Sequence, residues 1–247
     1  MPICYYICMG DINIRSHDRN LKGYFLPSSK MGESPAVLMV HGWTSSKNGY
    51  IEAAKRLQQS FTNINFLAFD LGGHGESDGD INELTIHDHV HDVFSAFDFL
   101  KLQATVDEDV VGIVGSSYGA YLTAITSKAK NPTSVLLRVP AIYPNEMFNR
   151  NKGADLRDDE YRRTIPDRVE NTALVSIKHF GGPVTIVESE NDELVPQTVL
   201  NAYEDAVSEN PEAQYLVMKG AGHKITTQAE VAEFDEIIGD WIERSLI

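Results

Sequence analysis

Ser117 lies in a Gly-Ser-Ser-Tyr-Gly turn between two segments of different character. Residues 110–114 are rich in β-branched side chains, as in a strand buried on both faces, and residues 120–125 continue with helical spacing. Glycines at both ends of the turn let a strand and a helix approach closely. A serine on such a corner projects its hydroxyl beside the N–H groups and positive dipole end of the helix. The pattern predicts a nucleophile at Ser117, with a plain strand-to-helix turn as the alternative.

A histidine after the last expected strand is the candidate general base. His223 ends the segment Gly-Ala-Gly-His at residues 220–223, and the glycines beside it allow the loop to place the imidazole over the sheet edge. An imidazole within reach of a serine hydroxyl takes its proton during attack. His41 and His74 also follow strands, but in glycine-containing turns where a histidine can brace the loop by hydrogen bonds. We therefore predict His223 as the base.

The acid that orients this imidazole is expected at residues 188–196, with the sequence ESENDELVP. Asp192 is favoured because the apolar end of this loop packs it in place and because a short side chain orients an imidazole more rigidly. Glu190 is the competing candidate. A solvated acidic loop with no catalytic role is the alternative.

Composition limits the class of protein. The chain has 247 residues, 42% of them hydrophobic, which suits one α/β domain with a substantial core. Its net charge of −15 makes nucleic acid and anionic membranes poor partners. The two cysteines, Cys4 and Cys8, imply no disulfide framework, and no segment reads as a signal peptide or a membrane span. We expect a cytoplasmic protein, and its oligomeric state stays open.

Strands and helices alternate along most of the chain. Residues 3–14 and 21–26 predict an opening antiparallel hairpin. Buried strands are expected at 36–40, 65–69, 110–114, 135–139, 184–187 and 214–218, and helices at 50–57, 85–102, from 120 onward, and at 169–180, 199–207 and 231–246. This alternation predicts a largely parallel sheet covered by helices on both faces. Ligands bind beyond the carboxyl ends of such strands, and the candidate residues all fall there.

These residues resemble the α/β-hydrolase superfamily, whose nucleophile, acid and histidine follow one another in the order of Ser117, Asp192 and His223. Four segments resemble family motifs: residues 41–43 its oxyanion loop, 70–77 its D-x-x-G-H-G-x-S loop, 192–196 its D-x-x-V-P segment and 220–223 its G-x-G-H segment. The chain is similar to small carboxylesterases, cinnamoyl or feruloyl-type esterases and serine aminopeptidase-like hydrolases. The resemblance implies the α/β-hydrolase fold, with a mostly parallel eight-stranded sheet, helices on both faces and a short cap insertion.

The resemblance also implies a mechanism. Ser117 attacks an acyl carbonyl, His223 takes its proton, and Asp192 holds the imidazole tautomer. The backbone N–H groups of Trp43 and Tyr118 form the oxyanion hole. The expected substrate is a small-molecule carboxylic ester with a short acyl or arylacyl group, and the mechanism calls for no metal and no cofactor. Amide or peptide cleavage, thioester cleavage and a non-catalytic binding role stay open as alternatives.

Substrate choice is expected to lie in a small cap. Residues 1–247 are expected to form one domain, with the cap inserted at about residues 140–168. Tyr143, Met147 and Phe148 are candidates to line an acyl or aromatic pocket with Trp43, and packing of the cap onto the domain is the alternative. Arg138 lies near the carboxyl end of the buried strand expected at 135–139 and is a further candidate to face the site.

The arginines of residues 138–168 are matched by an equal number of acidic residues. Asp158 and Arg162, and likewise Asp159 and Arg163, have i,i+4 spacing, and Asp155 adds to the acidic set. A solvated, ion-paired cap helix is therefore expected, and an anion-binding cap is the alternative.

Three histidines, His87, His89 and His91, alternate with acidic residues at the start of the helix expected at 85–102. Only His87 and His91 share a helix face. We interpret the cluster as a solvated helix start, with a metal site as the alternative.

Overall fold

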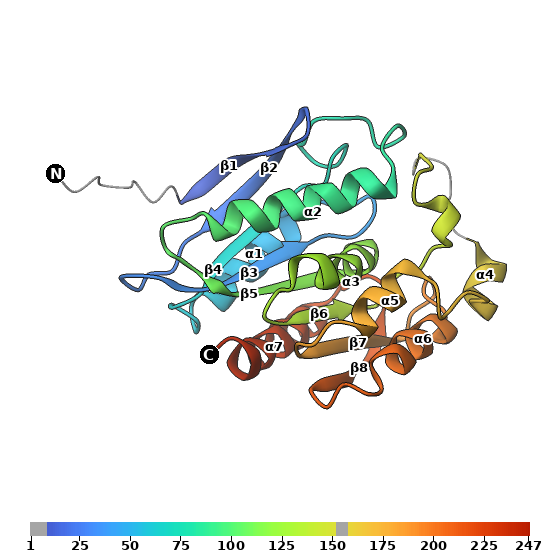
Figure 1. The fold of residues 1–247 in the computed structure, drawn as a ribbon. Coiled ribbons are helices and arrows are strands. Elements are labelled where there is room, and N and C mark those ends of the chain that lie inside the picture. Colours follow the sequence, from blue (N-terminus) through green and yellow to red (C-terminus); the bar gives the residue numbers. More distant parts are fainter. Residues whose placement is uncertain (1–8, 152–157) are drawn as a thin grey trace.

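Eight strands form one sheet in the order β1-β2-β4-β3-β5-β6-β7-β8 in the computed structural model, which describes residues 9–151 and 158–247 (Figure 1). The strands are β1 (Gly10–Ser16), β2 (Arg19–Leu26), β3 (Ser34–Val40), β4 (Asn65–Phe69), β5 (Val106–Ser116), β6 (Val135–Arg138), β7 (Val184–Asn191) and β8 (Ala213–Gly222). The helices are α1 (Asn48–Leu57), α2 (Ile86–Lys101), α3 (Tyr118–Lys130), α4 (Asp159–Thr164), α5 (Thr172–Lys178), α6 (Gln197–Val207) and α7 (Gln228–Ser245).

The opening hairpin is antiparallel, and the rest of the sheet is parallel. β1 pairs with β2, and β2 pairs with β4, in antiparallel register, whereas β3 to β8 pair in parallel. Both the hairpin and the mostly parallel sheet predicted from the sequence are confirmed. The part of the hairpin expected before residue 9, with Cys4 and Cys8, lies outside the described residues.

Register places the ends of neighbouring strands side by side. Val40 of β3 pairs with Gly115 of β5, Ser116 pairs with Arg138 of β6, and Arg138 pairs with Val187 of β7. The loops that leave these strands therefore start from one edge of the sheet, as expected for parallel strands.

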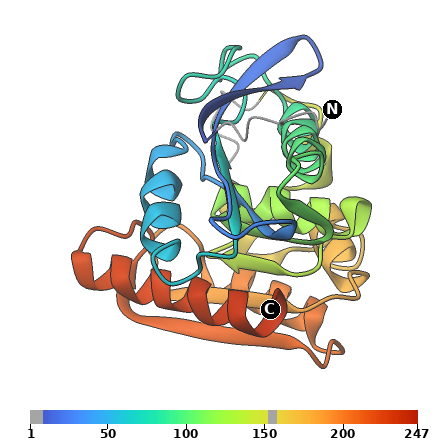
Figure 2. The ribbon, with the colours of Figure 1, turned by 90° about the vertical axis from the view of Figure 1, so that its left-hand side faces the viewer.

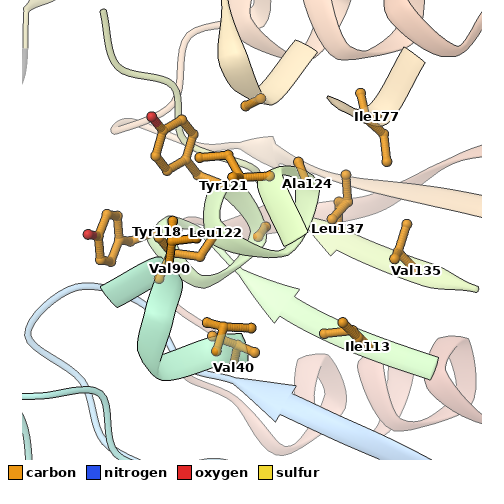
Figure 3. Packing of buried hydrophobic residues seen from close by; sticks show 14 of the residues in the cluster. Val40, Val90, Ile113, Tyr118, Tyr121, Leu122, Ala124, Val135, Leu137 and Ile177 are labelled. Carbon is orange, nitrogen blue, oxygen red and sulfur yellow. The ribbon is translucent and has the colours of Figure 1, made fainter. Parts of the chain in front are cut away.

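Two hydrophobic layers enclose the sheet, one on each face. One layer packs α2, α3, α5 and α6 against alternate strand residues such as Leu38 and Val40, and Figure 3 shows part of it around α3. The other packs α1 and α7 against the intervening residues, such as Val37 and Met39. Figure 2 shows α1 and α7 together on the side of the sheet away from α2 and α3. Successive side chains of a strand point to opposite faces of the sheet, so apolar residues at both sets of positions pack against helices on both faces.

Both long helices begin with a capping box. Thr85 accepts a hydrogen bond from the backbone of Asp88 at the start of α2, and Thr227 accepts one from Glu230 at the start of α7. The carboxylate of each acidic residue in turn accepts a hydrogen bond from the backbone N–H of its capping threonine. These bonds satisfy N–H groups that have no partner within the helix. No helix among the described residues is long and apolar enough to cross a membrane.

The described part of the segment expected to form the cap contains two short helical elements. A 3₁₀ helix (Asn145–Met147) and α4 lie in it, and its residues 152–157, including Asp155, are outside the described residues. Asp158 caps α4 by accepting a hydrogen bond from Tyr161 N. Arg162, expected on a solvated face, is instead buried and donates to the carbonyl of Leu194 at 2.9 Å. This arginine fastens the cap to the loop that carries Asp192.

Candidate active site

Ser117 lies between β5 and α3 in a strained backbone conformation, with φ 55° and ψ −115°. Such a conformation costs on the order of 1–3 kcal/mol for a residue with a side chain, and it persists only where the surroundings hold it. Here the Ser117 amide donates to Arg138 O at 2.8 Å. The Ser117 carbonyl accepts from Tyr121 N and from Ala141 N, both at 3.1 Å. The end of β6 and the first turn of α3 thus hold the serine on its corner.

The two glycines of the turn are required by close approach. A Cβ added at Gly119 would lie 2.2 Å from Val40 O, and one added at Gly115 would lie 2.5 Å from Gly119 O. No side chain fits at either distance. The Gly-x-Ser-x-Gly spacing therefore reflects direct backbone packing between β3, β5 and α3.

The structure brings Ser117, His223 and Asp192 into one line of hydrogen bonds. His223 Nε2 lies 3.1 Å from Ser117 Oγ, and His223 Nδ1 lies 2.8 Å from Asp192 Oδ2. Since a carboxylate can only accept, the imidazole proton belongs on Nδ1 and Nε2 is left to accept from the serine hydroxyl. The exposed fractions of the Asp192 and His223 side chains are 3% and 11%, so water has little access to their contact.

Asp192 is held by its own loop. Its Oδ1 accepts from the amides of Leu194 and Val195, both at 2.8 Å. Burial alone would raise the pKa of Asp192, but hydrogen bonds from His223, Val195 and Leu194 outweigh burial and lower the pKa. The carboxylate is therefore ionised at neutral pH. The competing candidate, Glu190, is exposed and binds Lys219 Nζ and Gly220 N on β8.

The loop after β3 adjoins the serine. A Cβ added at Gly42 would lie 4.0 Å from Ser117 Oγ, so the segment that contains Trp43 passes next to the hydroxyl. His41 braces this loop, as the sequence suggested: its Nδ1–H donates to Gly42 O at 2.7 Å and its Nε2 accepts from Leu71 N at 3.0 Å. Burial lowers the pKa of His41 to about 4, so this imidazole is neutral. Tyr118, the other residue expected to donate to an oxyanion, begins α3 directly after Ser117.

A buried ion pair joins the loop after β3 to the loop after β4. Lys47 Nζ donates to Asp70 Oδ2 at 2.7 Å and to Glu76 Oε2 at 2.6 Å, and Lys47 N donates to Asp70 Oδ1. Lys47 and Asp70 are 4% and 0% exposed. Burial alone would lower the pKa of Lys47, but its bonds to Asp70 and Glu76 outweigh burial and raise the pKa, so the ammonium group stays charged.

Replacing Lys47 with methionine should lower the free energy of unfolding by about 3–5 kcal/mol, because Asp70 would be left buried and unpaired. Urea unfolding followed by circular dichroism measures the change. The matched control is Lys55→Met, because Lys55 forms an exposed pair with Glu52 and its loss should leave stability nearly unchanged. Equal stability of the two variants would show that the buried pair contributes little.

His89 is not on a solvated helix start, and that part of the interpretation is wrong. Its side chain is fully buried, with Nδ1 accepting from Tyr118 Oη at 2.9 Å and Nε2–H donating to Gly72 O at 3.1 Å. Burial lowers the pKa of His89 to about 3. His87 and His91 lie at the surface with their Nε2 atoms 3.2 Å apart. Within the part of the chain that the structure describes, no group of three or more candidate ligands is arranged to hold a metal ion.

A cavity of about 450 Å³ opens beside Ser117 and His223, between α1 and α7. Its apolar lining consists of Trp43, Tyr50, Ala53, Ile225, Val231 and Phe234. Arg138 also contributes to the lining, and an ion pair between Arg56 of α1 and Asp235 of α7 lies among the lining residues. The cavity is thus mostly apolar with a few polar groups, the usual character of a small-molecule site.

The five residues proposed to contact substrate separate into two groups. Trp43 and Arg138 line the cavity. Tyr143 does not: it is 4% exposed and packs its ring 5.0 Å from that of Tyr121. Met147 and Phe148 also lie outside this cavity, partly buried against the core layer of α2 and α3. These three residues thus pack the cap against the domain, which was the alternative to lining a substrate pocket.

Sequence reasoning missed the contributions of α1 and α7. Tyr50 Oη lies 2.8 Å from Ser116 Oγ, and burial raises the pKa of Tyr50 to about 12, so its hydroxyl is protonated at neutral pH. Phe234 covers the other side of the cavity. Neither residue lies in a motif. Only the apolar face of each helix could have indicated that it points inward.

The strand order, the elbow at Ser117 and the helices on both faces define the α/β-hydrolase fold. A family model described as alpha/beta hydrolase fold matches residues 35–136, from β3 to β6 with Ser117 included. The resemblance drawn from the sequence is therefore confirmed, and so is the fold.

Particular proteins are similar over most of the chain. Two relatives in sequence are the uncharacterized protein Rv2307c of Mycobacterium tuberculosis (25% identity; 86% of this chain and 72% of the relative) and mouse mitochondrial palmitoyl-protein thioesterase ABHD10 (21%; 86% and 77%). Two solved structures are the Pyrococcus furiosus esterase Pf2001 (TM-score 0.72, 24% identity; 98% and 94%) and Est1E of Butyrivibrio proteoclasticus with ferulic acid bound (TM-score 0.77, 17%; 95% and 98%). Esterases and a thioesterase thus share this fold with the chain.

Proposed function

We propose that this chain is a serine hydrolase that cleaves carboxylic esters with short acyl or arylacyl groups through an acyl-enzyme intermediate. The observation that carries the proposal is the line of hydrogen bonds from Ser117 through His223 to Asp192, with bonds of 3.1 and 2.8 Å, beside an apolar cavity. Nucleophile, base and orienting acid are the groups that acyl transfer needs.

In the proposed reaction Ser117 Oγ attacks the acyl carbonyl carbon while His223 Nε2 takes the hydroxyl proton. The backbone N–H groups of Trp43 and Tyr118 stabilise the negative charge on the carbonyl oxygen. The carbon–oxygen bond to the alcohol then breaks, and His223 returns the proton to the leaving alkoxide. Water, deprotonated by the same imidazole, releases the acid and restores Ser117. Asp192 stays ionised and stabilises the imidazolium at both stages.

We place the substrate in the cavity between α1 and α7 rather than under the cap. The cavity adjoins Ser117 and has apolar walls, whereas Tyr143, Met147 and Phe148 pack elsewhere. Its volume of about 450 Å³ is in the range of small-molecule sites and suits a compact acyl or aryl group. Ferulic acid bound in Est1E, whose fold is similar, supports an arylacyl group.

Labelling with a fluorophosphonate tests the proposal. The wild-type protein should hydrolyse p-nitrophenyl esters, with a preference for acyl chains that fit the cavity. One equivalent of the reagent should abolish this activity, and peptide mapping should locate the label on Ser117. Hydrolysis that persists in fully labelled protein, or a label on another residue, would overturn the mechanism.

Thioester cleavage is the second candidate function. Mouse ABHD10, a sequence relative over most of the chain, is named a palmitoyl-protein thioesterase. Both reactions would use the same serine, histidine and aspartate. Rates on acyl thioesters and oxygen esters with the same acyl group separate the two, and a kcat/KM that is higher for the thioester would favour this candidate.

A further inference from the structure

Arg138, the last residue of β6, contacts the segments that carry all three proposed catalytic residues. Its backbone carbonyl accepts from Ser117 N at 2.8 Å. Its guanidinium donates to the carbonyls of His223, at 3.0 Å, and Gly222, at 3.2 Å. One residue therefore holds the backbone of the nucleophile with its main chain and the backbone of the base with its side chain.

The acid loop is the third segment. Arg138 Nη2 donates to the buried hydroxyl of Ser189 at 2.9 Å. The carbonyl of Ser189 accepts from Asp192 N at 3.0 Å, in the tight turn that ends β7. The guanidinium thus links the turn that carries Asp192 to the loop that carries His223 by hydrogen bonds to both.

Among the described residues, no carboxylate is bonded to the Arg138 guanidinium, and the charges of Asp192 and Glu230 favour its charged form only from beyond ion-pair distance. Arg138 is 4% exposed, and no acidic side chain among the described residues forms an ion pair with its guanidinium. Its Nε has no hydrogen-bond partner within residues 9–151 and 158–247, and the ring of Phe234 lies 5.5 Å from its guanidinium carbon. Burying an arginine in this way costs free energy that carbonyl dipoles only partly offset.

We propose that Arg138 is a positioning residue that holds the His223 loop against the end of β6, so that the imidazole stays aligned between Ser117 and Asp192. The inference rests on the proposed function of these three residues. It gives Arg138 a different role from the substrate contact suggested by the sequence, because its described hydrogen bonds go to protein groups.

An arginine suits this role better than a lysine. The planar guanidinium donates in several fixed directions at once, and here it reaches two successive carbonyls and a hydroxyl. A lysine would keep the charge but would hold fewer of these groups in place. The imidazole would then move relative to Ser117 even though the fold persists.

The test compares Arg138→Met and Arg138→Lys with the wild type. Displacing a catalytic group by roughly 1 Å can cost about 100-fold in rate, and we expect a loss of about that size in kcat for Arg138→Met. KM should change less than kcat, because the other residues that line the cavity are unchanged. Arg138→Lys should recover part of the lost kcat. Phosphonylation of Ser117 should slow in parallel, since it depends on the same base.

Arg19→Met is the matched control for the loss of a mostly buried arginine. Arg19 is 12% exposed, pairs with Asp92 and does not line the cavity. This control should lower the melting temperature and leave kcat unchanged. An Arg138→Met variant that loses stability but keeps its kcat would overturn the proposal and leave Arg138 a purely structural residue.

A pair of esters separates positioning from substrate recognition. p-Nitrophenyl butyrate and the p-nitrophenyl hemiester of succinate differ by a carboxylate in the acyl group. Positioning predicts the same loss of kcat for both esters in Arg138→Met. A rise in KM confined to the acidic ester, with kcat retained, would overturn it in favour of direct contact with a substrate anion.

Proton NMR measures the alignment of the His223 imidazole without any turnover of substrate. The Nδ1–H of an imidazole bonded to a carboxylate gives a low-field resonance, which should be present in the wild type and in Arg19→Met. It should weaken or shift in Arg138→Met, and an unchanged resonance would contradict the proposal. Failure of the proposed function would look different: the wild type would show neither ester hydrolysis nor labelling of Ser117.

Discussion

Replacing Ser117 with alanine is expected to lower kcat for ester hydrolysis by about a millionfold, the loss seen when the serine of a comparable triad is removed. Among the described residues, no other hydroxyl forms a hydrogen bond with His223 Nε2. The hydroxyl is held at the corner between β5 and α3, 3.1 Å from the proposed base His223, and its strained backbone fixes the direction in which it points. The residual rate should come from binding and from the proposed oxyanion donors, Trp43 and Tyr118, which the substitution leaves intact. Steady-state hydrolysis of a p-nitrophenyl ester measures the change.

The adjacent serine provides the control. Ser116 also lines the cavity, but its hydroxyl is bonded to Tyr50 and is not in the line with His223. Ser116→Ala should therefore lower activity by less than about tenfold, the order of one lost hydrogen bond. If Ser117→Ala kept its activity and Ser116→Ala lost it, the nucleophile would be the neighbouring residue.

Local sequence patterns were sufficient to predict the strands and helices but not the order of the strands in the sheet. The strand from Ser34 to Val40 is almost continuously apolar because both its faces are covered, and this composition is visible in the sequence. The placement of β4 between β2 and β3 depends on pairing between strands that are distant in the chain. No short-range pattern carries that information. The resemblance to a known fold implied a mostly parallel eight-stranded sheet, and the strand order itself came from the structure.

The site could be predicted where a motif ends a strand. The glycine-flanked loops around Ser117 and His223 both follow parallel strands, and parallel strands end at one edge of the sheet. The cavity could not be predicted in this way, because its walls come from helices. Arg56 and Asp235, which form an ion pair across it, are 179 residues apart in the sequence.

The burial of His89 could have been predicted from its position in the sequence. It lies three residues after Ile86 and four before Val93, on the stripe of α2 that faces the core. That spacing predicts burial of His89. The prediction of a solvated helix start grouped it instead with His87 and His91, which lie at the surface. Arg138 is a contrasting case, because its strand predicts burial, but its partners are backbone carbonyls that no sequence pattern marks.

Replacing Asp192 with asparagine is expected to lower kcat by about 10⁴-fold with little change in stability. The carboxylate accepts from His223 Nδ1–H at 2.8 Å, which leaves Nε2 free to accept the serine proton. An asparagine amide group at that position would donate to Nδ1 and place the imidazole proton on Nε2, where it blocks attack. The other oxygen can still accept from the amides of Leu194 and Val195, so the loop should keep its shape. The kcat of each variant and its melting temperature together measure both parts of the expectation.

Glu190→Gln is the control with the same change of charge, two residues away. Glu190 is exposed and binds Lys219 and Gly220, so this variant should keep kcat within about threefold of the wild type. An equal loss in both variants would mean that the summed negative charge of the loop matters rather than one oriented carboxylate. A large loss in Glu190→Gln alone would make Glu190 the orienting acid. The contact of 2.8 Å between Asp192 and the imidazole leads us to expect neither result, because tautomer control requires direct contact with Nδ1.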